Sequence, residues 1–165
     1  MENFYLVLNT IISAEHRYAL RVEKALSMLI NQHSGQLDKS GYPYILHPLA
    51  VANSFNSGKH SFRYMAGLLH DIVEDNEEIS FHDIQDIFGD KMAGVIYLLT
   101  RPNDLTYFQY IDRLIKSGNK DAMAVKLADL NHNLSRPGKI PDSLRERYVK
   151  AKGLIKAALK GGINS

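Results

Sequence analysis

The sequence contains no cysteine among its 165 residues. A framework of disulfide bonds is therefore excluded, and any metal centre has to be built from histidine, aspartate and glutamate side chains. These residue types are well represented, with 7 histidines and 18 acidic residues. The composition is thus compatible with a metal site that has nitrogen and oxygen ligands.

A strong charge of either sign and a long apolar run are also missing. The formal net charge is only +2, which does not indicate a nucleic-acid-binding surface. Glu2 stands where a secretory signal carries basic residues, and the apolar stretch 4–12 is too short to span a bilayer. We expect a cytoplasmic protein that binds neither nucleic acid nor a membrane, and the sequence contains no indication of its oligomeric state.

Helical periodicity dominates the rest of the sequence. Apolar residues recur at spacings of three and four in the segment 14–32, which indicates an amphipathic helix. Ser80 with Asp83 forms a predicted capping box, and Asp90 and Thr106 are predicted to cap two later helices. No segment alternates as a half-buried strand does. The sequence therefore predicts an all-α fold, a single compact domain over 1–165, with further helices at 47–56, 62–73, 81–88, 90–99, 107–116, 121–134 and from 142 onward.

The pair His70-Asp71 is followed by two more acids, Glu74 and Asp75. On a helix, at about 100° per residue, these four side chains fall within an arc of roughly 140°, opposite an apolar face. Clustered carboxyl groups raise one another's pKa unless a cation neutralises them, and a bound metal ion would do so. The alternative is an ordinary solvated face, although the apolar residues 66–69 favour a packed helix.

Asp129 and His47 are the other candidate ligands. Asp129 follows the apolar run 124–128, and a buried carboxylate without a partner costs several kcal/mol. A metal ion is one partner, and the alternative is an ion pair with Lys126 or a contact with Asn133. His47 directly precedes Pro48 at a predicted helix start, where it could instead cap the helix or fill the core.

Together, these residues predict a metal site formed by His47, His70, Asp71 and Asp129. Two imidazoles and two carboxylates suit Mn²⁺, Fe²⁺ or Co²⁺ and tolerate Zn²⁺. Such an ion can polarise a phosphoryl group and lower the pKa of a bound water molecule. Glu74 and Asp75 are placed to handle protons, and His132 is expected to orient Asp129.

The order of these ligands, with the segments 41–52, 67–75 and 125–129 around them, resembles the hydrolase domain of the Rel/SpoT alarmone enzymes. These enzymes lie within the HD superfamily of metal-dependent phosphohydrolases, and stand-alone members are called small alarmone hydrolases. The resemblance covers about residues 19–148. It implies an all-helical HD-type bundle, a Mn²⁺ ion, and removal of the 3′-pyrophosphate from ppGpp (guanosine 3′,5′-bis(diphosphate)) or pppGpp. It also implies that Glu74 and Asp75 serve the attacking water.

The same resemblance suggests which residues bind the nucleotide. Family positions that line the nucleotide pocket match His33, Lys39, Asn133, Arg145 and Tyr148. We expect Lys39 and Lys126 to offer charge to the phosphates, and Asn133 to hydrogen-bond the sugar or a phosphate.

The chain departs from the family pattern at two places. Asp38 stands where the family often has arginine, and Leu130 and Ser135 stand where the family has arginine in the motif Asp-Arg-Leu-His-Asn-Met-Arg. Fewer guanidinium groups imply weaker binding of a highly anionic nucleotide. One alternative is therefore a hydrolase of another nucleotide, a sugar phosphate or a phosphodiester. A second is a metal-bound binding module without catalysis, although retention of both Glu74 and Asp75 favours an enzyme.

Overall fold

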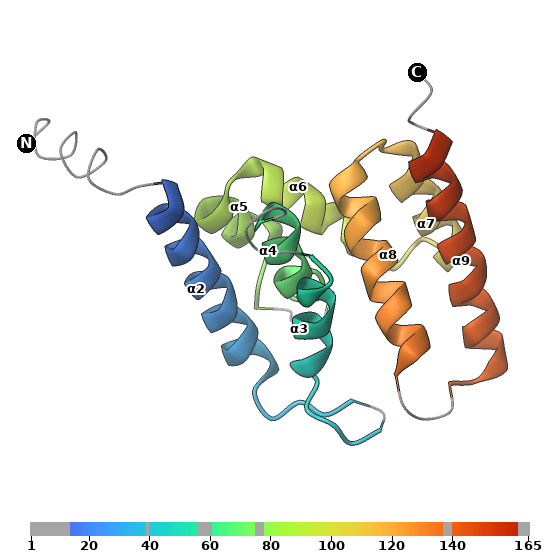
Figure 1. Cartoon of the computed structure of the whole chain (residues 1–165), viewed down its shortest axis with the longest axis horizontal. Coiled ribbons are helices and arrows are strands. Elements are labelled where there is room, and N and C mark those ends of the chain that lie inside the picture. The colour runs from blue at the N-terminus through green and yellow to red at the C-terminus, as the bar shows by residue number, and fades with distance from the viewer. Residues whose placement is uncertain (1–13, 39, 56–60, 75–77, 137–139, 162–165) are drawn as a thin grey trace, which may run out of the picture.

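The computed structural model describes residues 14–38, 40–55, 61–74, 78–136 and 140–161 (Figure 1). Within these ranges the chain forms helices and no strand, apart from an isolated bridge between Leu37 and Pro43. The prediction of an all-α fold is confirmed. The helices are α2 (Ala14–His33), α3 (Leu46–Asn53), α4 (Ser61–Leu69), α5 (Phe81–Phe88), α6 (Asp90–Leu99), α7 (Tyr107–Lys116), α8 (Lys120–Ser135) and α9 (Asp142–Gly161).

Two capping boxes fix the starts of α5 and α7. The Ser80 hydroxyl accepts a hydrogen bond from the Asp83 amide, and the Asp83 carboxylate accepts one from the Ser80 amide at 2.8 Å. Thr106 and Gln109 repeat this arrangement at the start of α7. Each box satisfies two amide groups that the first helical turn leaves without partners.

Asp90 does not cap α6, so that prediction is wrong. Gly89 holds the N-cap position with a φ of 86°, a conformation that glycine adopts without steric cost. Asp90 is instead the first helical residue, and its carboxylate accepts a hydrogen bond from the Gln85 side chain at 2.8 Å. Its negative charge still suits the positive end of the helix dipole.

α4 lies at the centre of the molecule and packs against α2, α3, α6 and α8. Its closest approach is to α3, at Gly67. A Cβ atom on Gly67 would lie 2.8 Å from the Cα atom of Ala52, so only glycine permits the two helices to come this close. This contact brings the start of α3 next to the end of α4.

α4 ends at Leu69, four residues before the predicted end, and residues 70–74 form a turn. The Nδ1 atom of His70 donates a hydrogen bond to the Gly67 carbonyl at 2.8 Å. The Ile72 amide then donates to the carbonyl of Leu69, three residues back, at 3.1 Å. The imidazole thus occupies a backbone carbonyl of the last helical turn, and the helix does not continue through residues 70–74. The prediction that His70, Asp71 and Glu74 share one helical face is therefore wrong.

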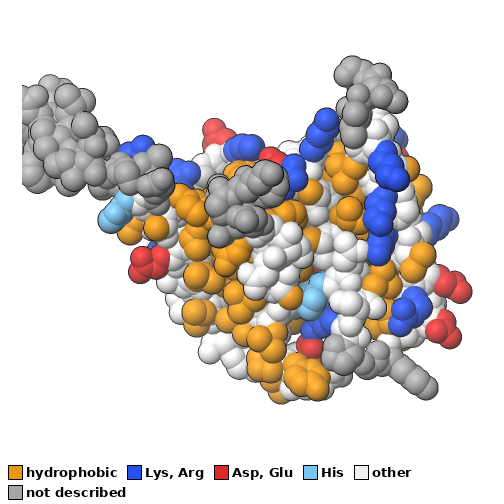
Figure 2. All heavy atoms as spheres, in the orientation of Figure 1, with side chains coloured by type: hydrophobic (Ala, Val, Ile, Leu, Met, Phe, Trp, Pro, Cys, Tyr) orange, Lys and Arg blue, Asp and Glu red, His pale blue; other side chains and the backbone are white. Residues whose placement is uncertain are grey.

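The two halves of the molecule present different surfaces. α8 and α9 run antiparallel, side by side, and Figure 2 shows Lys and Arg side chains gathered over α9. Hydrophobic side chains gather over α2 on the same face, where Val22 and Ile30 line a shallow apolar groove. None of the helices that the structure describes is both long and apolar enough to cross a membrane.

Candidate metal centre

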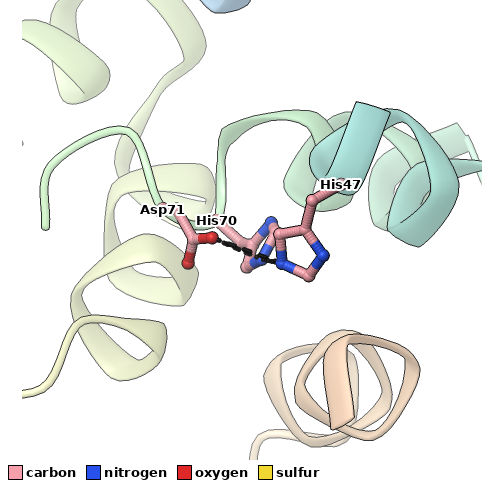
Figure 3. A group of neighbouring side chains, drawn as sticks. All are labelled: His47, His70 and Asp71. Carbon is pink, nitrogen blue, oxygen red and sulfur yellow. Dashed lines mark hydrogen bonds and ion pairs between the residues drawn. The ribbon is translucent and has the colours of Figure 1, made fainter. Parts of the chain in front are cut away.

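Three elements meet at a buried cluster of ligand-type side chains. His47 comes from the first turn of α3, and His70 and Asp71 come from the turn after α4, and the three point toward one another (Figure 3). The Nε2 atom of His70 lies 3.0 Å from Oδ2 of Asp71 and 3.3 Å from Nε2 of His47. His47 Nε2 lies 3.5 Å from the same Asp71 oxygen.

α8 adds a second carboxylate to this cluster. The Oδ1 atom of Asp129 lies 3.2 Å from Nε2 of His47 and 3.8 Å from Nε2 of His70. Asp129, His47 and His70 are each at most 4% exposed. The four predicted ligands therefore converge at the junction of α3, α4 and α8.

The donor set fits a divalent transition-metal ion. His70 Nδ1 donates to the Gly67 carbonyl, which fixes the ring so that Nε2 is the nitrogen that faces the cluster. Two imidazole nitrogens and two carboxylate oxygens are the kind of ligands that Mn²⁺, Fe²⁺ and related ions accept. His47, His70 and Asp71 already form a group able to hold such an ion.

Protons on the histidines of the cluster offset the negative charges of the aspartates. Burial alone would lower the pKa of His47, but its hydrogen bonds to Asp129 and Asp71 raise that pKa to about 9. Burial would likewise raise the pKa of Asp129, but the positive charge of Lys126 and the contact with His47 hold it below its ordinary value. A metal ion would supply the same positive charge in place of the imidazole protons.

Both alternatives considered for Asp129 are also present. Lys126 Nζ lies 2.8 Å from Oδ2 of Asp129, and Asn133 Nδ2 donates to Oδ1 at 2.5 Å. Asp129 makes these contacts in addition to its contact with the histidine cluster, because His47 also approaches its Oδ1 atom. Asp129 is thus held from three sides, which fixes the direction of its carboxylate.

His132 contacts His47, where we expected it to orient Asp129. Its Nδ1 atom lies 2.7 Å from Nδ1 of His47. Burial and the positive charges of His47 and Arg136 lower the pKa of His132 to about 4, so its ring is neutral and its Nδ1 atom accepts a hydrogen bond from Nδ1 of His47. His132 therefore orients a histidine ligand through the nitrogen that faces away from the cluster.

A polar cavity of about 310 Å³ adjoins the cluster. Its wall includes the candidate ligands His47, Asp71 and Asp129. The remainder comes from α7, α8 with the residue that follows it, and α9, and from Tyr44, Glu74 in the turn after α4 and Arg101 in the loop after α6. The cavity wall combines cationic side chains with carboxylates, a combination that suits a phosphorylated ligand bridged to a metal ion.

Four of the other predicted site residues line this cavity: Glu74, Lys126, Asn133 and Tyr148. His33 does not; it is 3% exposed, and its Nδ1 atom lies 2.6 Å from Oε1 of Gln36. Its ring packs against that of Tyr44, with centroids 5.0 Å apart. Arg145 is exposed and does not line the cavity either, whereas Arg147, half a turn further along α9, does. Lys39 and Asp75 lie outside the described residues.

Six lining residues were not predicted from the sequence: Tyr44, Arg101, Tyr107, Arg136, Leu144 and Arg147. The Tyr44 hydroxyl donates to Oδ2 of Asp71 at 2.5 Å. Tyr44 could have been predicted as a site residue, because it lies in the segment 41–52 that carries the family resemblance. The buried Tyr107 hydroxyl has no hydrogen-bond partner among the residues the structure describes. Nothing in the local sequence marks the three arginines, because packing alone brings them to the cavity.

Comparison with known proteins agrees with this geometry. The chain is 29% identical over 140 residues to the bifunctional (p)ppGpp synthase/hydrolase SpoT of Escherichia coli, covering 79% of this chain and 20% of that protein. It is 33% identical over 130 residues to the guanosine-3′,5′-bis(diphosphate) 3′-pyrophosphohydrolase of Spiroplasma citri, covering 71% of this chain and 17% of that one. The chain thus spans about a fifth or less of the length of these relatives.

A solved structure shares the fold over most of its length. It is that of a metazoan ortholog of SpoT that hydrolyses ppGpp and plays a role in starvation responses. The two structures superpose with a TM-score of 0.69 at 25% sequence identity, covering 86% of each chain. The family model of the HD domain matches residues 25–135, which include all four candidate metal ligands. The chain belongs to the HD domain family.

Proposed function

We propose that this protein is a metal-dependent phosphohydrolase that removes the 3′-pyrophosphate from ppGpp or pppGpp. The observation that carries the proposal is that His47, Asp71 and Asp129, three of the four clustered residues, line a cavity whose wall also carries cationic side chains. The similarity to relatives named as ppGpp 3′-pyrophosphohydrolases supports the choice of substrate. The compartment we propose for the reaction is the cytoplasm.

Mn²⁺ is the ion we propose for the cluster. When bound, a divalent ion supplies charge that polarises the phosphoryl group and acidifies a water molecule. Tyr44 and Lys126 would keep the two ligand carboxylates oriented, through the 2.5 Å contact with Asp71 and the 2.8 Å contact with Asp129. His132 would keep His47 oriented in the same way.

The reaction requires one proton acceptor and one proton donor. Water attacks the phosphorus atom bonded to the 3′ oxygen, and the bond between this phosphorus and the 3′ oxygen breaks. The 3′ oxygen takes up a proton as pyrophosphate leaves. We propose Glu74, on the cavity wall, as the group that accepts the proton of the water, with Asp75 beside it in sequence. The Arg101 amide donates to Oε2 of Glu74 at 3.3 Å, which helps to hold this carboxylate at the cavity.

The remaining wall would bind the nucleotide. Lys126, Asn133 and Tyr148 line the cavity and are proposed contacts for phosphate and sugar oxygens. The roles of His33, Lys39 and Arg145 in substrate binding also remain proposals.

The test is release of phosphate and pyrophosphate with added Mn²⁺ from ppGpp, pppGpp, GTP, ATP and a sugar phosphate. Wild-type protein should release pyrophosphate from ppGpp, and Asp129→Ala should lose the activity. Asp121→Ala is the matched control, because Asp121 lies on the same helix but pairs with Arg63 and Lys91 outside the cavity. Release from ppGpp by Asp129→Ala at the wild-type rate would overturn the proposal.

A second candidate is hydrolysis of a different phosphoester by the same centre. Asp38 and Ser135, which stand at positions where the resembling family has arginine, favour this candidate. Activity on another member of the panel, with ppGpp untouched, would establish it. Binding of a nucleotide without hydrolysis of any substrate would instead favour a binding module.

A further inference from the structure

Arg136 links the cavity to a loop that is distant in sequence. It is the residue that ends α8, and it lines the cavity. Its Nη2 atom forms an ion pair with Oδ2 of Asp38, a residue 98 positions earlier in the loop between α2 and α3. Asp38 is not part of the cavity wall, so it holds the guanidinium from outside the site.

The carboxylate of Asp38 is itself firmly held. Its Oδ1 atom accepts hydrogen bonds from the amides of Ser40 at 2.7 Å and Tyr42 at 3.0 Å, and the Asp38 amide donates to the Tyr42 carbonyl at 2.8 Å. The Asp38 side chain is 8% exposed and that of Arg136 is 23% exposed. The ion pair therefore joins a rigid turn to a helix end, and Arg136 has little freedom to swing away.

The position of Arg136 relative to the metal centre indicates what it can contact. Asp129, Asn133 and Arg136 all line the cavity from one side of α8. At 1.5 Å per residue, Arg136 lies roughly 10 Å along the helix from the ligand Asp129. A nucleotide whose 3′-pyrophosphate sits at the metal centre would therefore bring a distant group to Arg136.

Two other cations of the cavity wall, Lys126 and Arg147, are already engaged with groups that line the same cavity. Lys126 contacts Asp129, and the guanidinium of Arg147 lies over the Tyr107 ring, 5.5 Å from its centroid. Arg136 differs from these two because Asp38 approaches it from outside the cavity. A guanidinium fork held in this way can present its remaining donors to phosphate oxygens in a fixed geometry.

We propose that Arg136 binds the 5′-phosphate chain of the nucleotide and that Asp38 is the residue that positions it. This inference rests on the proposed function and names the part of the substrate that this end of the cavity recognises. It also gives Asp38 a role: the negative charge in the loop holds a guanidinium that comes from α8. The site thus has a substrate-binding arginine next to Asp38, although the loop between α2 and α3 has an aspartate at the position where the resembling family often has arginine.

The experiment compares two nucleotides and four proteins loaded with Mn²⁺. The nucleotides are ppGpp and guanosine 3′-diphosphate, which lacks the 5′ phosphates. The proteins are wild type, Arg136→Gln, Asp38→Asn and the double variant. Arg63→Gln is the matched control, because it removes an Arg–Asp pair that lies outside the cavity and whose arginine is similarly exposed.

We expect Arg136→Gln to raise KM for ppGpp roughly tenfold to a hundredfold, as loss of a charge-assisted contact implies, with kcat nearly unchanged. Its effect on guanosine 3′-diphosphate should be small. Asp38→Asn keeps an oxygen for the two backbone amides but loses its charge, so it should raise KM for ppGpp by a smaller factor. It should have no further effect in the Arg136→Gln background, because Asp38 acts through Arg136.

Two results would overturn the inference. One is an equal loss of affinity for both nucleotides, which would place Arg136 at the base or ribose. The other is a lowered melting temperature with unchanged KM, as expected for Arg63→Gln. If wild-type protein hydrolyses neither nucleotide, the proposed function fails, and calorimetric binding decides the role of Arg136 separately. A preference for ppGpp that Arg136→Gln abolishes would support that role, and the absence of a preference would refute it.

Discussion

Replacing Gly67 by alanine is expected to force α3 and α4 apart. The added Cβ atom would lie 2.8 Å from the Cα atom and 2.9 Å from the amide nitrogen of Ala52, whereas ordinary contact begins at 3.4 Å. Both atoms belong to a helix backbone, so no side-chain rotation relieves the clash. The two helices carry His47 near the start of one and His70 just after the end of the other.

Two opposing effects set the magnitude. Alanine is favoured over glycine in a helix interior by about 0.8–1 kcal/mol. Overpacking of a close-packed core costs typically about 1–3 kcal/mol. We therefore expect Gly67→Ala to lower the free energy of unfolding by up to about 2 kcal/mol, or roughly 4–8 °C in melting temperature for a domain of this size.

The assay is urea denaturation together with calorimetric titration of Mn²⁺. Gly94→Ala is the matched control, because Gly94 also lies within a helix but has no atom within 4 Å of its Cβ position. That variant should be as stable as wild type or more stable, whereas Gly67→Ala should lose stability and bind Mn²⁺ more weakly. If Gly67→Ala were stabilised to the same extent as Gly94→Ala, the close approach of α3 and α4 would be refuted.

Three further predictions concern the centre and its surroundings. Tyr44→Phe removes the hydroxyl that donates to Asp71 and should weaken Mn²⁺ binding by about 10–100-fold in calorimetry; unchanged affinity would contradict the orienting role. A concentration of Mn²⁺ a hundred times its Kd should stabilise the protein by about 2.7 kcal/mol in urea titrations, and the same addition to Asp71→Ala should not. Burial acts to raise the pKa of Asp121, but its contacts with Arg63 and Lys91 hold that pKa below the ordinary value. Because the folded pKa is the lower one, this stabilisation is present above the unfolded pKa of about 3.9 and is lost as pH falls through the folded value. Asp121→Asn should therefore cost no more than about 1 kcal/mol at pH 7 and progressively less as the pH falls through the folded pKa, and a cost that does not change with pH would contradict the ion pairs.

Local interactions allowed the sequence to predict most of the helices. The capping boxes at Ser80 and Thr106 depend on residues three positions apart, and the apolar periodicity of α2 is visible within one segment. The choice of the four candidate metal ligands was also available in the sequence, since acids and histidines beside apolar runs indicate buried polar groups. These features need no knowledge of which helices pack together.

The arrangement of the site was decided only by the tertiary structure. α4 ends at Leu69, where the His70 ring forms a hydrogen bond with the Gly67 carbonyl, and the helical pattern of the sequence does not reveal this contact. The contact of His132 with His47 and the ion pair of Arg136 with Asp38 join residues 85 and 98 positions apart. Such contacts depend on how α3, α8 and the loop before α3 are packed. The sequence by itself determined the helices and the chemistry of the ligands, and helix packing decided which cations surround them.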